Sequence, residues 1–338
     1  MNERITFVSM FDNNNLAKIE NYTKMIDDKL CKVPFGKNVD NREEADTLPY
    51  HFTLSAWDIL HEEKVINELS KIEYPKLKIL INNIGIMNGK EIYNWLEHHC
   101  NEEVTLNKML APEIEARYKL TNKLLNKYGI KQVLELAAGY SSRGLFYSKK
   151  GYNYVELDLE NVTKNKKEIL HSIEKDIPEN LNIISGNALK KDDFKKIESY
   201  FITDKPIAVI NEGLMRYLTF DEKKLVAQNI YDLLSKYGGI WITCDVTPKK
   251  FMKSQDKALP DFNKNLSNIT SRNNLNDRFE DENHIRRFFG EVGFELVEIH
   301  KFNEMKDELY SINELGIIDD KIEKTLEDAI VVIMKIKK

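Results

Sequence analysis

Beyond Ile130, apolar segments of strand length alternate with longer segments of helical pattern, and no other feature of the sequence constrains the fold as much. Strands that alternate with helices build a parallel sheet covered by crossover helices. The clearest helical pattern lies at 221–236, where leucine and isoleucine residues recur at nearly the spacing of one helix face. The sequence therefore predicts an α/β domain with parallel strands at 132–136, 154–157, 181–185, 207–211 and 239–245, and a further helix at 163–173.

The alternation lapses in the polar segment 247–283, which is rich in Asn, Asp and Lys and is interrupted by Pro248 and Pro260. A connection of this length without structure of its own is uncommon in a compact domain, so we expect a helical lid, an insert or a flap over a site. The closing elements are expected to be a helix at 284–292 and strands at 294–300 and 329–337.

The first 90 residues follow a different pattern. Segments of strand pattern at 5–10, 51–57 and 77–86 alternate with helical segments at 16–29 and 62–72. A chain of 338 residues is long for one domain. We therefore expect a small α+β module at 1–90 and a larger domain at 91–338, which begins with helices before Ile130.

Composition and charge disfavour several classes of protein. The formal charge of −5, from 50 basic and 55 acidic residues, is unlike the dense basic surface of a general nucleic-acid binder. The wide spacing of Cys31, Cys100 and Cys244 disfavours disulfide and zinc sites. The sequence shows neither a secretory signal pattern nor an apolar run long enough to span a bilayer. We expect a cytoplasmic protein with no metal and no membrane association, and its oligomeric state stays open.

The segment QVLELAAGYSSRGL at 132–145 carries the strongest chemical signal. A predicted strand that contains Glu135 runs into a tight turn with Gly139, which follows Ala137 and Ala138. Small residues let a ligand approach the backbone closely, and the N-terminus of the helix that follows favours an anionic group. The turn is therefore a candidate ligand site, although a glycine after a strand is structural in many α/β domains.

A second acid, Asp158, ends the next predicted strand in the segment YVELDL. In nucleotide-binding α/β folds an acid at this place accepts hydrogen bonds from ribose hydroxyls, and the structural alternative is a helix cap. Asp158 and Gly139 together favour cofactor binding more than either residue alone. The turn lacks the G-x-G-x-x-G pattern of dehydrogenases, because Ala137 and Ser142 stand where the first and third glycines would fall.

The order of motifs from about residue 110 to 338 resembles the leucine carboxyl methyltransferase family, a branch of the class I S-adenosylmethionine (SAM)-dependent methyltransferases. AAGYSSR resembles the family's G-A-G-x-D-T-R motif, with Gly139 and Arg143 kept and Ser141 in place of Asp. LAPEIEARY, YVELD, SGNAL and VINEGLMRYLT resemble its other motifs. The resemblance implies a doubly wound, Rossmann-like sheet that is mostly parallel and has an antiparallel last strand.

The resemblance also implies a cofactor site for SAM and its product, S-adenosylhomocysteine (SAH). Arg117 would bind the methionine carboxylate, and Glu212 would lie near the amino group and the sulfonium. The structural alternatives are a surface ion pair for Arg117 and a helix cap for Glu212.

The other implied cofactor residues follow the first three strands of the domain. Gly139 would let the cofactor approach the backbone, next to Glu135. Asp158 would hold the ribose, and Asn187 and Ala188 would border the adenine.

The implied reaction is methyl transfer to an oxygen of a small molecule, either a carboxylate or a hydroxyl. Because the sulfonium methyl is already a strong electrophile, catalysis depends mainly on holding the acceptor close and aligned. A carboxylate needs no base, whereas a hydroxyl usually does. Tyr217 is a candidate for the acceptor pocket. His171, His284 and His300 are candidate bases by residue type alone, and ordinary surface or helix-end positions explain them as well.

LPYHFTLSAWD at 48–58 resembles one H-x-T motif of the two-histidine phosphoesterases, which include RNA-end ligases. Those enzymes use two such histidines, whereas only His51 is followed here by a matching residue, Thr53. The module therefore resembles half of a phosphoesterase. It could be a scaffold, a binding site for a nucleotide-like or phosphorylated acceptor, or half of a site that two chains complete. Phosphodiester chemistry at His51 and Thr53, and SAM binding without catalysis, stay open as alternatives to methyl transfer.

Overall fold

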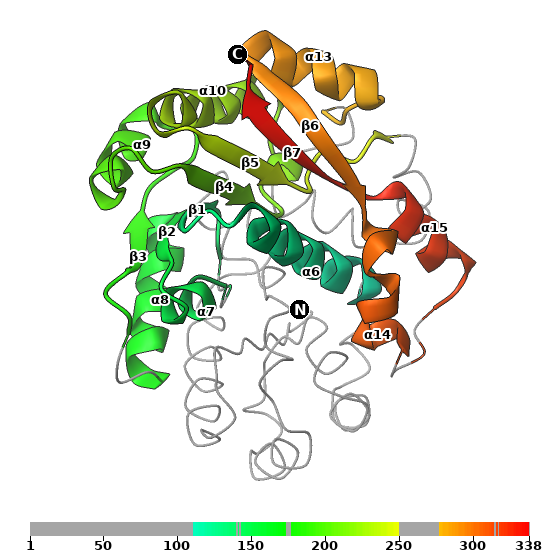
Figure 1. Ribbon diagram of the computed structural model, residues 1–338, viewed down its shortest axis with the longest axis horizontal. Helices are drawn as coiled ribbons and strands as arrows, with labels where there is room; N and C mark the ends of the chain where they lie inside the picture. Colours follow the sequence, from blue (N-terminus) through cyan, green and yellow to red (C-terminus); the bar gives the residue numbers. More distant parts are fainter. Residues whose placement is uncertain are drawn as a thin grey trace, which may run out of the picture.

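The computed structural model describes residues 111–139, 141, 143–173, 177–249, 277–313, 316 and 318–337. The expected module at 1–90, with His51 and Thr53, lies outside the described residues, and so does the central part of the expected insert at 247–283. Figure 1 shows the described part as one sheet with helices on both sides.

A seven-stranded sheet forms the centre of the described part, in the order β3-β2-β1-β4-β5-β7-β6. The five strands from β1 to β5 pair in parallel, and β7 runs antiparallel to both of its neighbours. The expected doubly wound sheet with an antiparallel last strand is thus confirmed. The strands are β1 (Gln132–Leu136), β2 (Asn153–Asp158), β3 (Leu181–Ser185), β4 (Ile207–Asn211), β5 (Gly239–Thr243), β6 (Phe294–Lys301) and β7 (Ile330–Ile336).

Helices cover both faces of the sheet. One face carries α6 (Ala111–Tyr128), α7 (Arg143–Lys149) and α8 (Glu160–Ile173), and the other carries α9 (Lys191–Ile197), α10 (Phe220–Tyr237) and α13 (Glu282–Val292) (Figure 1). Shorter elements complete the fold: η5 (Glu198–Tyr200), η6 (Met215–Tyr217), η7 (Phe302–Glu308), α14 (Tyr310–Asn313) and α15 (Asp320–Asp328).

Most expected elements lie within a few residues of the observed ones. The largest difference in a strand is at β5, which ends at Thr243 rather than at Asp245. Helix α13 begins inside the expected insert, because the side chain of Asp281 accepts a hydrogen bond from the backbone N–H of His284 and caps the helix. Near the two ends of the expected insert, the backbone N–H of Lys249 donates to the carbonyl oxygen of Phe279 at 2.7 Å.

The core between the sheet and α10 and α13 is apolar and centres on Trp241 of β5. The Trp241 ring contacts Phe289 and Phe294 edge to face. Its indole N–H donates to the side-chain oxygen of Asn211 at 2.7 Å, so the polar atom of this buried side chain has a partner. Trp241 and Asn211 are both 0% exposed. This packing fixes β5 against β4 and so positions the ends of both strands.

No helix within the described ranges is long and apolar enough to cross a membrane.

The pairing of β4 with β5 predicts a large effect for one substitution. Gly239 has φ +122°, and a Cβ there would lie 2.0 Å from the carbonyl oxygen of Ile207. Gly239→Ala should lower the free energy of unfolding by roughly 3–5 kcal/mol, since it combines a clash with a strained backbone. Gly129→Ala is the control: its φ is +63° but its Cβ would meet nothing within 4 Å, so the cost should be about 1 kcal/mol. Urea unfolding followed by circular dichroism measures both, and equal losses would contradict the prediction.

Candidate functional site

Apart from Arg117 on α6 and Glu135 within β1, the residues expected to form a site lie at or just beyond the carboxyl ends of β1 to β4. Parallel strands place these ends at one edge of the sheet, and the strand order reverses between β1 and β4. Ligands of open α/β sheets bind at such a reversal. The structure therefore brings the expected site residues to the edge where a ligand site is common in this class of fold.

The turn after β1 is held by the acid at the end of β2. Ala137 and Gly139 have φ values of 52° and 53°. The backbone N–H of Gly139 donates to Asp158 Oδ2 at 2.6 Å, and that of Leu159 donates to Asp158 Oδ1 at 2.7 Å. Burial raises the pKa of Asp158 to about 6, although these two hydrogen bonds act to lower it. Asp158 and Gly139 therefore lie in direct contact, as a shared site requires.

The Asp158 carboxylate can still accept further hydrogen bonds. A carboxylate offers about four acceptor positions, and the backbone donors use two of them. Asp158 is 8% exposed, so little of its side chain contacts solvent. Its expected contact with ribose hydroxyls stays a prediction.

Ser141, which replaces the family's Asp, holds the start of α7. Its hydroxyl accepts a hydrogen bond from the backbone N–H of Arg143 at 3.2 Å, and its carbonyl oxygen accepts one from Lys166 Nζ at 2.7 Å. Lys166 also pairs with Glu156 at 2.5 Å, and both side chains are buried. Burial raises the pKa of Glu156 to about 7, against the opposing effect of Lys166. The hydroxyl of Ser141 thus caps this helix, and the buried Lys166 holds the turn through its hydrogen bond to the Ser141 carbonyl oxygen.

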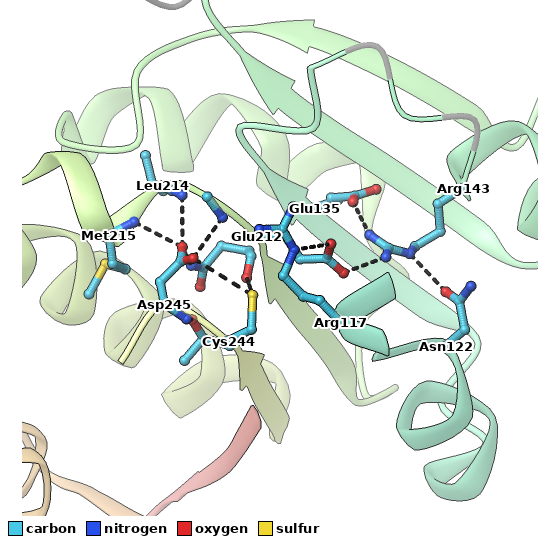
Figure 2. A network of polar contacts seen from close by, with 12 residues as sticks. Arg117, Asn122, Glu135, Arg143, Glu212, Leu214, Met215, Cys244 and Asp245 are labelled. Atoms are coloured by element: carbon cyan, nitrogen blue, oxygen red, sulfur yellow. Dashed lines mark hydrogen bonds and ion pairs between the residues drawn. The ribbon is translucent and has the colours of Figure 1, made fainter. Parts of the chain in front are cut away.

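Arg143 lies at the centre of a polar network that joins two strands to α6 (Figure 2). Its guanidinium donates to Glu135 of β1 and to Glu212 beyond β4, and its Nε donates to Asn122 Oδ1 of α6 at 2.8 Å. The guanidinium also lies 4.4 Å from the centre of the Tyr118 ring. Burial opposes the charge of Arg143, but Glu212 and Glu135 outweigh that effect and raise its pKa.

Glu135 lies beneath the site. It is 2% exposed, and both of its carboxyl oxygens have protein partners, Arg143 and the hydroxyl of Tyr154 at 2.7 Å. The described contacts connect Glu135 to the edge through Arg143. Its direct part in cofactor binding is untested.

Arg117 and Glu212 come from distant segments and form an ion pair. Arg117 Nε of α6 lies 3.3 Å from Glu212 Oε2, but the geometry does not make a hydrogen bond, so this buried N–H has no hydrogen-bond partner within the structure as described. Arg143 contacts the other oxygen of the same carboxylate. The structure thus brings together the two residues that were expected to bind the amino-acid part of a cofactor, and it leaves one donor of Arg117 unused.

Asn187 and Ala188 lie in the loop between β3 and α9. The side-chain oxygen of Asn187 accepts from the backbone N–H of Leu189 at 2.9 Å, and its backbone N–H donates to Asp193 at 2.9 Å. The carbonyl oxygen of Ala188 accepts from Asn229 at 2.9 Å. Both residues therefore have a fixed backbone next to the end of β2, and their contact with an adenine stays a prediction.

The sequence analysis missed Asp245, which shapes the turn after β4. Its carboxylate accepts hydrogen bonds from the backbone N–H groups of Gly213, Leu214 and Met215, at 2.7, 2.7 and 3.0 Å (Figure 2). It also accepts one from the side chain of Asn211 at 2.8 Å. An acid two residues beyond a strand end is the only local signal that could have identified it.

The candidate acceptor and base residues differ in position. Tyr217 ends η6 next to this turn and is partly buried. His284 packs among Phe220 and Phe279 at the start of α13. His300 lies on the outermost strand, β6, between two glutamates that raise its pKa although burial lowers it.

The histidine positions do not support a base. His284 and His300 have contacts that explain them structurally, and the side chain of His171 lies outside the described part. Among the described residues, no group of three His, Cys, Asp or Glu side chains could hold a metal ion.

Comparison with known proteins gives one family match. Residues 88–231 match the model of the leucine carboxyl methyltransferase family. No curated protein matches the chain in sequence.

Several solved structures are similar in part. A proposed O-methyltransferase from Nostoc punctiforme is 14% identical with a TM-score of 0.41, and the alignment covers 73% of this chain but only 60% of that protein. Magnesium protoporphyrin IX methyltransferase from Synechocystis, solved with SAH, is 10% identical with a TM-score of 0.44, over 72% of this chain and 94% of that one. Geranyl diphosphate C-methyltransferase from Streptomyces coelicolor is 10% identical with a TM-score of 0.41, over 74% and 85%. Likenesses this partial carry no weight for the function.

The family match begins at residue 88, close to the expected domain boundary, and ends within α10. It therefore includes every residue that was expected to bind the cofactor, from Arg117 to Glu212. Residues 88–231 of this chain are thus similar to the leucine carboxyl methyltransferase family over less than half of the chain.

Proposed function

We propose that the protein is a SAM-dependent methyltransferase that transfers the methyl group to an oxygen, a carboxylate or a hydroxyl, of a small molecule. The observation that carries the proposal is the contact of Arg117 with Glu212 at the edge of the sheet, within the segment that matches the family. A positive and a negative side chain side by side suit the carboxylate and the ammonium of an amino acid.

The residues present fit the amino-acid part of SAM. Arg117 has a buried Nε–H without a hydrogen-bond partner in the described part of the chain, and a carboxylate is the strongest acceptor for a guanidinium. Glu212 is held on one side by Arg143, which fixes the position of its charge before a ligand arrives. Pre-positioned charges avoid the cost of reorganisation on binding.

The turn that contains Gly139 fits the adenosine part. Ala137, Ala138 and Gly139 carry little or no side chain, so a ligand can approach the backbone there. Asp158 has acceptor positions that the described donors do not occupy and that suit hydroxyl groups. Both features lie over β1 and β2, next to the point where the strand order reverses.

The bound cofactor supplies an electrophilic methyl group, and the protein's part is to bind, to align and to exclude water. A carboxylate acceptor is already ionised at neutral pH and needs no base, whereas a hydroxyl usually does. Tyr217 lies beside the turn after β4, where it could line the acceptor pocket.

Binding of SAH tests the proposal directly. Calorimetry with the full chain should show micromolar affinity, and Arg117→Met should weaken it by roughly tenfold to a hundredfold, because a charge-assisted hydrogen bond is lost. Lys123→Met is the matched control, since Lys123 lies on the same helix and pairs with the exposed Glu308. No heat of binding to the folded parent protein, or the same loss in both variants, would count decisively against the proposal.

The pKa of Asp158 predicts a pH dependence of cofactor affinity. As the pH falls through about 6 the carboxylate takes up a proton, and SAH affinity should decrease by roughly tenfold because a neutral acceptor is weaker. The stability of the free protein should change in the opposite direction. Because the pKa of Asp158 is higher in the folded protein than its ordinary value of 3.8, its protonated form stabilises the fold. This stabilisation is complete below pH 3.8 and is lost as the pH rises through about 6.

Asp158→Asn separates this effect from other titrations. The variant should bind SAH with an affinity that changes little between pH 5 and 7.5, whereas the parent protein should lose affinity at the lower end. Thermal unfolding at each pH shows whether the variant is folded. A parallel decrease in both proteins would assign the pH dependence to another group.

Arg143 should be needed for both stability and binding. Arg143→Met leaves Glu135 and Glu212 buried without their shared partner, which should cost roughly 3–5 kcal/mol of unfolding free energy. Arg143→Lys keeps the charge but cannot reach both acids and Asn122, so it should recover part of the stability while SAH affinity stays low. Chemical unfolding and calorimetry test these expectations, and full SAH affinity in a folded Arg143→Lys variant would exclude a positioning role.

A further inference from the structure

Three arginine side chains lie at the edge of the sheet near β1, β4 and β5. They differ in how many of their N–H donors have partners among the described residues. Arg143 makes hydrogen bonds through Nε and both terminal nitrogens. Arg117 has an ion pair with Glu212 and a buried Nε–H without a hydrogen bond. Arg216 has neither a hydrogen bond nor an ion pair with any residue that the structure describes, and its Nε is buried as well.

The backbone that carries Arg216 is fixed. Arg216 is the middle residue of η6 and directly follows the turn whose N–H groups donate to Asp245. Its side chain is partly buried. A buried, charged donor without an acceptor costs free energy in any folded state, so a partner is expected from outside the described chain.

The acids at the ends of β1, β4 and β5 in the described part are already engaged. Glu135 and Glu212 neutralise Arg143 and Arg117. Asp245 accepts hydrogen bonds from the backbone of the turn before Arg216. None of these three carboxylates is therefore free to move to Arg216 without leaving its present donors.

Arg216 lies four residues beyond Glu212, in the segment that follows β4. Gly139, Asp158 and Asn187 belong instead to the ends of β1, β2 and β3. Burial and the charge of Asp245 raise the pKa of the Cys244 thiol, while the positive charges of Arg117 and Arg216 lower it. Both guanidinium groups therefore lie within electrostatic reach of the same residue at the end of β5.

We propose that Arg216 binds an oxyanion of the methyl acceptor, a carboxylate or a phosphate, next to the cofactor site. This inference rests on the proposed function, since it needs a second ligand beside SAM. Arg216 then acts as a specificity residue that selects acidic acceptors over neutral ones. The fork of a guanidinium matches the two oxygens of such a group.

Titration of the full chain with small anions tests the proposal. The protein is saturated with SAH in a chloride-free buffer, so that Arg117 is occupied. Acetate labelled with 13C and inorganic phosphate are then added separately, and binding is measured by broadening of their NMR signals. The parent protein should bind at least one of the two, and Arg216→Met should weaken that binding by roughly tenfold to a hundredfold.

Matched variants exclude general effects of charge and folding. Arg286→Met removes an exposed arginine on α13 that pairs with Glu282, and it should bind the anion as the parent does. Arg216→Lys keeps the charge without the fork and should bind with intermediate affinity. It also keeps the test valid if Arg216→Met does not fold.

The outcomes separate this inference from the proposed function. Equal anion binding in the parent and in folded Arg216→Met would overturn it, and so would a loss of SAH affinity of more than tenfold in Arg216→Met, because Arg216 would then belong to the cofactor site. If the parent does not bind SAH, the methyltransferase proposal fails. In that case the same titration is done without cofactor, and weaker anion binding by Arg216→Met than by the parent would still support an anion site at Arg216. The tighter of the two anions identifies the acidic group of the acceptor.

Discussion

The described site depends on one buried positive charge that is shared by two acids. Glu135 lies in β1 and Glu212 lies just beyond the neighbouring strand β4. Without a counter-charge, two buried carboxylates would repel each other and lose hydration. Arg143 enters between them from α7 and contacts both. Because α7 starts where Ser141 and Lys166 fix the turn, the geometry of the turn after β1 and the charge balance at the end of β4 are parts of the same arrangement.

The same side chain also connects the sheet to α6. Arg143 contacts Asn122 and lies over Tyr118, which are five residues and one residue after Arg117 on that helix. Arg117 in turn meets Glu212. The two residues expected to bind the amino-acid part of the cofactor are 95 positions apart in the sequence, from 117 to 212, and Arg143 is their common support. A positioning residue of this kind explains why the arginine of the AAGYSSR motif is buried rather than directed into a site.

Local patterns predicted most of the sheet, because buried strands and amphipathic helices have a periodicity that can be seen in sequence. The prediction was less accurate where a side chain, and not the periodicity, ends an element. The apolar pattern of β5 continues through Cys244, but Asp245 turns towards the N–H groups of a distant loop and the strand stops. Short polar helices such as α9, with the sequence KDDFKKI, were missed because too few apolar residues mark them. For the candidate site, motif order predicted Gly139, Asp158 and Glu212, and their role stays a prediction, whereas the burial of Glu135 and the contacts of Asp245 depend on distant segments that no local pattern encodes.

The charge balance at the edge bears on what can bind there. Arg117 and Arg143 are matched by Glu135 and Glu212, so this cluster is neutral as described. The amino-acid part of SAM carries one carboxylate and one ammonium, and it can therefore exchange contacts with Arg117 and Glu212 without leaving a charge unpaired. An anionic acceptor cannot do this, because every cation of the cluster is then in use, and burying an unpaired anion is costly. It needs a further cation, and Arg216, four residues beyond Glu212, has a buried Nε without a hydrogen-bond partner among the described residues.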